Sequence, residues 1–219
     1  METVACRARD RIVGMKRALA ALLLAVVAWI AYDLHRPSRG DIRNFDPKAV
    51  ARYDTDMWKA YYAKQPFKLF RQLTSLMSNQ YGQGPFRSVA TAFHAARAAF
   101  VFKEGRQRAD YEKALPDLVE YFRATMPPGE DLDKLAKLEL EWWIVHRERG
   151  ANLAAALVDL YAAMYHVAPE RVMEAAQLRA EAMAVRDSTA EWPRVADLLD
   201  RSWTSLHAAV QPSGAQLVR

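Results

Sequence analysis

The chain is poor in the residues and motifs on which most metal proteins and many enzymes depend. Its 219 residues include one cysteine, Cys6, so the rest of the chain has neither a disulfide nor a thiolate metal ligand. The eight glycines never cluster as a phosphate-binding loop requires, and no dinucleotide fingerprint, zincin motif or nucleophile elbow occurs. The five histidines stand apart and no Glu-x-x-His motif is present, which excludes a di-iron bundle site. We therefore predict no metal and no cofactor, and the balance favours a protein that is not an enzyme.

Positive charge is concentrated near the N-terminus. The chain has 31 Lys and Arg against 26 Asp and Glu, and its sequence pI is about 9.3. Residues 1–32 include five basic and two acidic groups, whereas residues 33–219 include 26 and 24. A near-neutral domain without a basic run is not suited to tracking phosphates, so we predict no nucleic-acid partner. A hydrophobic fraction of 52% also excludes a disordered chain.

An unbroken apolar run covers residues 18–32, directly after Lys16 and Arg17. This run is shorter than the ~20 residues that usually cross a bilayer. Snorkelling of the two basic side chains, with Trp29 and Tyr32 placed at the opposite interface, makes up the difference. We predict a membrane anchor that contacts lipid through residues 18–32. A cleaved signal peptide and a buried helix of a soluble protein remain the alternatives.

The charges that flank the apolar run predict its topology. Five Lys or Arg residues precede it, and Arg36, Arg39 and Arg43 follow it closely. By the positive-inside rule, the N-terminus is cytoplasmic and the large domain is extracytoplasmic. We accordingly expect a single-pass signal-anchor protein of the inner (cytoplasmic) membrane of a bacterium, with a periplasmic domain. Met15 is an alternative start of the chain.

From residue 41 onward the sequence favours helices throughout. No alternating strand pattern of useful length occurs, and Pro and Gly separate runs rich in Ala, Leu, Arg and Glu. The predicted helices cover residues 47–64, 67–81, 86–103, 109–125, 131–149, 152–166, 169–187 and 191–210. Short connections imply antiparallel neighbours, so we expect an all-α fold of about eight helices paired as αα-hairpins. An irregular helical bundle and a short helical-repeat array both remain open.

These patterns divide the chain into five segments. They are a basic tail (1–17), the anchor (18–32), a linker (33–45), an all-helical domain (46–210) and a flexible C-terminal tail (211–219). A domain of this size is long enough to bury a core of its own.

Alternate predicted helices carry ionisable residues in the middle of their apolar stripes. The candidate polar cluster consists of Asp54, Arg97, Glu139, His146, Arg179 and Arg186. The helix 131–149 is apolar over most of its circumference, so we expect its Glu139 and His146 to be well buried. An unpaired buried charge is costly, so the six residues should either pair with one another or line a polar pocket.

Three interpretations of this cluster remain open. In the first, Arg97 and Arg179 pair with Glu139 and Asp54 and thereby fix how the helices pack. In the second, two arginines grip an anionic ligand inside a pocket. In the third, Glu139 and His146 act as an acid and a base, although no nucleophile or oxyanion site is evident beside them.

The function that these features favour is a membrane-anchored, non-catalytic helical binding or scaffolding protein. The anchor would raise its local concentration for a protein partner at the same membrane. A subunit of a larger membrane complex, and an acid/base enzyme that uses the buried Glu, His and Arg residues, remain as alternatives.

Overall fold

The computed structural model describes residues 2–36, 41–149 and 152–212, with side chains from residue 14 onward. Within these ranges every regular element is a helix, which confirms the all-α prediction. Arg39 and most of the predicted C-terminal tail lie outside the described residues.

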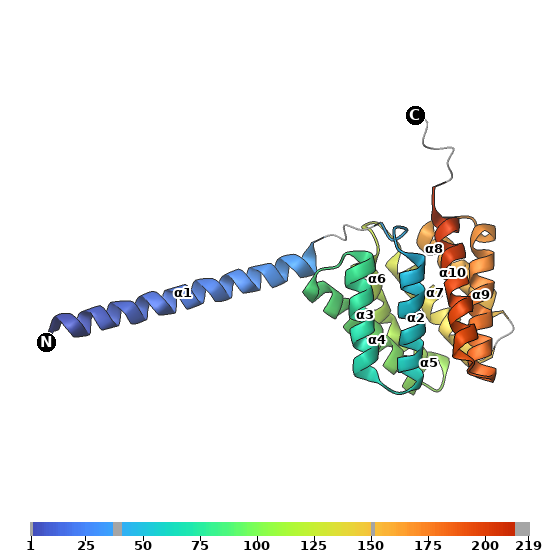
Figure 1. The fold of residues 1–219 in the computed structure, drawn as a ribbon, viewed down its shortest axis with the longest axis horizontal. Helices are drawn as coiled ribbons and strands as arrows, with labels where there is room; N and C mark the ends of the chain where they lie inside the picture. Colours follow the sequence, from blue (N-terminus) through green and yellow to red (C-terminus); the bar gives the residue numbers. More distant parts are fainter. Residues whose placement is uncertain (1, 37–40, 150–151, 213–219) are drawn as a thin grey trace, which may run out of the picture.

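The N-terminal helix α1 (Glu2–His35) projects away from the rest of the molecule (Figure 1). Its segment Gly14–His35 is long and apolar enough to cross a membrane, as judged by length and composition. Only 6% of the apolar window is buried, which is unlike the core helix of a soluble protein. The helix also continues past the predicted anchor into the predicted linker, as far as His35.

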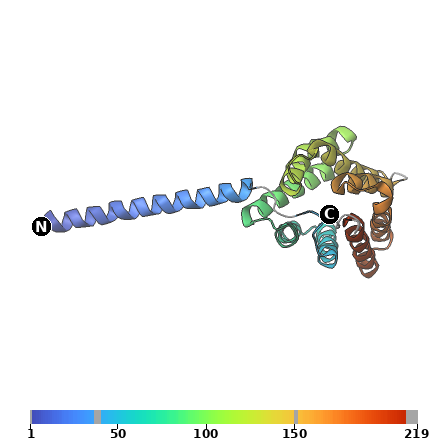
Figure 2. The same cartoon turned by 90° about the horizontal axis from the view of Figure 1, so that it is seen from above.

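The domain is a ring of helices. It comprises α2 (Pro47–Tyr62), α3 (Pro66–Tyr81), α4 (Pro85–Glu104), α5 (Arg108–Tyr111), the 3-10 turn η1 (Glu112–Ala114), α6 (Leu115–Thr125), α7 (Leu132–Arg147), α8 (Leu153–Tyr165), α9 (Pro169–Ser188) and α10 (Trp192–Val210). Each long helix packs on the next, and α10 packs on α2, so that α2, α3, α4 and α6 to α10 close a single-layer ring. Figure 2 shows this ring from its end. Each of these helices therefore has one face directed inward and one directed outward.

Local sequence signals place the ends of these helices. Proline occupies the first or second position of α2, α3, α4, α6, α9 and α10, where its missing N–H costs nothing. The Asp46 carboxylate accepts hydrogen bonds from the Lys48 and Ala49 amides and caps α2. Gly82 ends α3 with a positive φ of 61°, a conformation that favours glycine.

The predicted helix 109–125 is wrong as a single element. Residues 108–114 form α5 and η1, and the regular helix α6 begins only at Leu115. Pro116 has no amide hydrogen and its ring clashes with the preceding turn, so a continuous α-helix cannot pass through this position.

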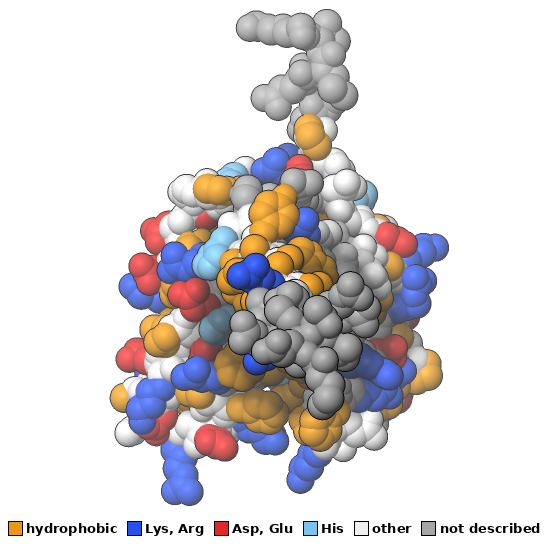
Figure 3. Space-filling view, turned by 90° about the vertical axis from the view of Figure 1, so that its left-hand side faces the viewer, with side chains coloured by type: hydrophobic (Ala, Val, Ile, Leu, Met, Phe, Trp, Pro, Cys, Tyr) orange, Lys and Arg blue, Asp and Glu red, His pale blue; other side chains and the backbone are white. Residues whose placement is uncertain are grey.

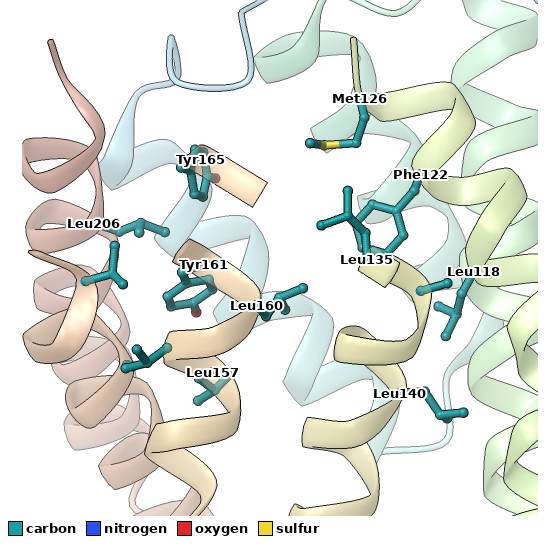
Figure 4. Packing of buried hydrophobic residues seen from close by; sticks show 14 of the residues in the cluster. Leu118, Phe122, Met126, Leu135, Leu140, Leu157, Leu160, Tyr161, Tyr165 and Leu206 are labelled. Carbon is teal, nitrogen blue, oxygen red and sulfur yellow. The ribbon is translucent and has the colours of Figure 1, made fainter. Parts of the chain in front are cut away.

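The main apolar core lies on the side of the ring formed by α6 to α10. Its buried side chains include Phe122 from α6, Leu135 from α7, Leu157 from α8 and Leu206 from α10 (Figure 4). A smaller cluster around Met77 joins α2 to α3. Packing of this kind, repeated between neighbours around the ring, supplies most of the stability of the domain.

The segment that precedes α2 crosses one end of the ring. Ile42 is buried in the main core. The Arg43 guanidinium donates to the Tyr165 carbonyl at 2.6 Å, and the Gln211 side-chain amide donates to the Arg43 carbonyl at 3.1 Å. These contacts join the start of the domain to the ends of α8 and α10.

Candidate functional site

A buried ion pair connects α2 to α9 across the inside of the ring. Asp54 accepts a hydrogen bond from Arg179 Nη1 at 2.5 Å and another from Trp203 Nε1 at 2.8 Å. The Arg179 guanidinium also lies over the rings of Trp58 and Trp203, 5.5 and 5.6 Å from their centres. Burial lowers the pKa of Arg179, but the Asp54 carboxylate outweighs this effect and the pKa is raised above its ordinary value. Arg179 is therefore positively charged, and the ion pair with the Asp54 carboxylate offsets that charge.

Glu139 on α7 lies close enough to Asp54 and Arg179 for the charges of both to affect its pKa. Burial raises its pKa above the ordinary value of 4.5, while Trp142, Arg179 and Trp143 act in the opposite direction. Trp143 Nε1 donates to Glu139 Oε1 at 2.9 Å. The buried Nε1 of Trp142 also lies close enough to this carboxyl group to lower its pKa, although its geometry falls short of a full hydrogen bond. A carboxyl group with a raised pKa retains its proton more readily and can then donate a hydrogen bond.

Four tyrosines surround the same region from three further helices. They are Tyr81 on α3, Tyr121 on α6, and Tyr161 and Tyr165 on α8. Burial raises the pKa of each, to about 12 for Tyr161, and the charge of Arg179 acts in the opposite direction on all four. Tyr161 and Tyr165 belong to the main core, and Tyr121 packs against both this core and the cluster around Met77, where Tyr81 also packs, so the phenol groups face the inside of the ring. Figure 4 shows Tyr161 and Tyr165 one above the other on α8.

The four phenol hydroxyls form no hydrogen bond with a described residue. Tyr161 and Tyr165 are nevertheless only 6% and 3% exposed. Within the described ranges, the fully buried polar side-chain atoms that lack a partner are Gln72 Oε1, Gln83 Oε1 and Trp142 Nε1. The tyrosine oxygens are not among them, so each retains accessible surface. Unsatisfied polar groups inside a protein call for a partner, either water or a ligand.

The remaining predicted site residues lie elsewhere. Arg97 pairs with Asp117 of α6 at 3.1 Å and its side chain is 61% exposed, so it does not face Glu139 or Asp54. Asp117 also contacts His94 Nδ1 at 2.9 Å. Arg97 therefore joins two neighbouring helices from the outside of the ring.

His146 and Arg186 share a partner at the end of the ring where α7 and α9 terminate. His146 Nε2 lies 3.0 Å from Asp187 Oδ2, and Arg186 Nη1 lies 2.6 Å from Asp187 Oδ1. The Arg186 guanidinium covers the ring of Tyr62 on α2. The seven-residue separation of Glu139 and His146 corresponds to roughly 10 Å along a helix. Their partners also differ, so the geometry gives no acid/base couple between them.

Two recesses on the described surface lie away from the residues of the ring interior. Recesses of about 480 and 580 Å³ lie between α1, α4 and the 126–132 loop, and between α7 and α8. None of the six predicted residues lines either recess. No group of three His, Cys, Asp or Glu side chains gathers in the described part of the chain as a metal site would require.

The inner face of the ring thus combines one neutralised ion pair, a carboxyl group with a raised pKa, four phenol hydroxyls and an indole N–H. It holds donors and acceptors in excess of those that the protein itself uses. The arrangement has no activated nucleophile and is suited to holding a molecule by hydrogen bonds. Comparisons with protein-family models, with curated proteins and with solved structures find no match to this chain.

Proposed function

We propose that this chain is a membrane-anchored, non-catalytic binding protein whose ring interior holds a small uncharged molecule rich in carbonyl or hydroxyl oxygens. The observation that carries the proposal is the set of four inward tyrosine hydroxyls that form no hydrogen bond with a described residue. Uncharged ligands are favoured because Asp54 and Arg179 already neutralise each other. A negative charge brought into this interior would find no free counter-charge to offset its desolvation, because Arg179 is already paired.

The membrane anchor determines where in the cell this binding protein would act. The apolar segment of α1 supports a single pass through the inner membrane, and the flanking charges favour a cytoplasmic N-terminus with the ring outside. Tethering would hold the ring near the membrane and raise its effective concentration for a protein partner located there.

Native mass spectrometry of the full chain, extracted from membranes in mild detergent, tests the proposal. The test variant is the double substitution Tyr81→Phe with Tyr161→Phe, which removes two hydroxyls without protein partners. The control variant is Tyr53→Phe, which removes a hydroxyl that accepts a hydrogen bond from Asn79 Nδ2. We expect a bound small molecule in the wild type and the Tyr53 variant, and its loss in the double variant. Thermal unfolding of the double variant should stay within about 1 kcal/mol of the wild type, since no protein hydrogen bond is deleted.

Two uncharged probes extend the test when nothing co-purifies. Maltotriose supplies hydroxyl groups and N-acetyl-trialanine amide supplies carbonyl groups, and binding of either should depend on Tyr81 and Tyr161. If the purified wild type contains no bound small molecule and binds neither probe, the ligand proposal fails. A stoichiometric protein that co-elutes with an empty ring would instead favour the alternative, a subunit of a membrane complex.

A further inference from the structure

The junction between α1 and the ring is rigid. The Asp33 carboxylate accepts hydrogen bonds from the backbone amides of Phe86 and Arg87 at 2.8 and 3.1 Å, so that a residue of α1 caps the N-terminus of α4. Asp33 is buried, and the rings of Trp29 and Phe86 meet edge to face at 5.0 Å. The Arg87 guanidinium also donates to the Arg36 carbonyl. Helix α1 therefore leaves the ring in a fixed direction.

That direction sets how the ring stands on a membrane. Helix α1 runs across the axes of the ring helices and meets the side formed by α3 and α4 (Figure 1). A transmembrane helix is usually tilted by only ~20° from the bilayer normal. The ring helices must then lie along the membrane surface, with α3 and α4 nearest to it.

Little chain separates the bilayer from the ring. The apolar run ends at Tyr32, and Asp33 is already bonded to α4. Because the run is shorter than the ~20 residues that a bilayer usually requires, its flanks are drawn toward the interface. Trp29, near the end of the run, contacts Phe86. The same contact brings the first turn of α4 to headgroup level.

The outer face of α4 is apolar where an outer face should be polar. Phe86, Val89, Phe93 and Phe100 fall within one narrow sector of the helix at 100° per residue, and Val89, Phe93 and Phe100 are exposed. The buried residues of α4 are, by contrast, mostly small: Ser88, Thr91, Ala92 and Ala98, with Arg87. Apart from Phe102, which packs against the main core, the large aromatic groups of α4 point outward and its small residues point inward, the reverse of what burial within the domain alone would favour.

This pattern is confined to one side of the ring. From residue 41 onward the described chain exposes five large apolar side chains, and four of them, Phe67, Val89, Phe93 and Phe100, lie on α3 and α4. The fifth is Met173 on α9. Helices α3 and α4 are antiparallel around a turn at residues 82–84, which sets Phe67 level with Phe100. The exposed groups therefore form a surface instead of isolated positions.

The same hairpin carries the basic excess of the domain. Residues 66–104 include Lys68, Arg71, Arg87, Arg97 and Lys103 against one acidic residue, Glu104. Figure 3 looks along α1 at this side and shows apolar and basic side chains together around the end of the helix. Apolar groups flanked by Lys and Arg are typical of surfaces that lie in a membrane interface and favour anionic lipids.

We propose that the α3–α4 face, defined by Phe67, Val89, Phe93 and Phe100 with Lys68 and Arg71, is a second membrane-binding surface. It holds the ring flat against anionic lipid while α1 spans the bilayer. The inference rests on the membrane anchor of the proposed function, but not on any ligand inside the ring.

Lipid quenching of single labels in the full chain tests this surface. With Cys6→Ser as background, Phe93→Cys and Phe100→Cys carry the polarity-sensitive fluorophore NBD on the proposed surface. Met173→Cys is the control, because its apolar side chain is 44% exposed, close to the 52% of Phe93, and lies on α9 across the ring. Leu24→Cys, in the apolar run, reports insertion of α1. The vesicles contain phosphatidylcholine with or without phosphatidylglycerol, and doxyl-labelled lipid is the quencher.

We expect quenching at positions 93 and 100 to exceed that at 173 several-fold, and to increase with phosphatidylglycerol. The variant Lys68→Glu with Arg71→Glu should remove that increase while leaving insertion intact. Quenching at 24 with no excess at 93 and 100 over 173 would overturn the second surface and leave the anchor standing. No quenching at 24 would refute the anchor itself. If the labels at 93 and 100 are equally shielded in detergent without a bilayer, a protein, either a second copy or a partner, occupies the face and the lipid assignment is wrong.

Discussion

Removing Asp54 should cost more stability than any other single change of a charged residue inside the ring. Replacement by alanine leaves Arg179 buried without its counter-charge, and Trp203 Nε1 loses its acceptor. The Arg179 and Asp54 side chains are only 11% and 7% exposed, so water cannot replace the lost partner. We expect the free energy of unfolding to fall by about 3–5 kcal/mol. For a domain at the low end of ordinary stability, about 5 kcal/mol, this loss is more than half of the total.

Urea denaturation of the full chain in mild detergent, followed by near-ultraviolet circular dichroism, measures this loss. The matched control is Arg194→Ala, which breaks the pair with Glu181 on the ring surface, where the side chains are 59% and 48% exposed. Solvent screens that pair, so its removal should cost no more than about 1 kcal/mol. The difference between the two variants isolates the effect of burial.

A double variant separates loss of the pair from loss of packing. Asp54→Leu with Arg179→Met replaces both charges by apolar groups, and it should be markedly more stable than Asp54→Ala because no charge remains unpaired. The two changes are then strongly non-additive. The reasoning is refuted if Asp54→Ala costs less than about 1 kcal/mol, or if the double variant costs the sum of its two single changes.

Two further predictions concern Glu139 and the junction of α1. The raised pKa of Glu139 means that the folded state binds its proton more tightly, so stability should decrease as pH rises from about 4.5 toward the folded-state pKa. Glu139→Gln should flatten this decrease in urea midpoints, and an unchanged slope would show that Glu139 does not cause it. Asp33→Ala should weaken the start of α4 by about 1 kcal/mol, detected as faster hydrogen exchange at the Phe86 and Arg87 amides. Gly84→Ala should have a similar effect, because its Cβ would lie 1.7 Å from Asp33 Oδ1; normal exchange in both variants would rule out the cap.

The helices could be predicted because their boundaries depend on neighbouring residues. Pro47, Pro66 and Pro169 each begin a helix, and the prediction places these starts within one residue. Closure of the ring could not be predicted in the same way. It depends on α10 packing against α2, which are far apart in sequence, and no local pattern encodes that contact.

The residues of the interior site could be predicted only in part from local sequence patterns. Charges within apolar stripes indicated Asp54 and Arg179, which the fold brings together. The tyrosines were missed because a tyrosine in an apolar stripe resembles any other aromatic core residue. The spacing of Tyr161 and Tyr165, four residues apart on one helix face, was the available signal. It could not reveal that their hydroxyls would lack partners, because that depends on helices elsewhere in the ring.

Arg97 shows why an apolar stripe does not by itself identify the inside of a domain. The stripe of Phe86, Phe93 and Phe100 predicted that α4 turns this face inward and buries Arg97 with it. The structure turns the face outward, and the interior side of α4 consists mostly of alanine, serine and threonine, with Arg87 near its start and Phe102 near its end. Periodicity reports that a helix has an apolar side, but the partner of that side can be the core or a bilayer. In the proposed arrangement α4 is bonded directly to the end of the membrane-spanning helix, so it would meet both environments and would present one face to each.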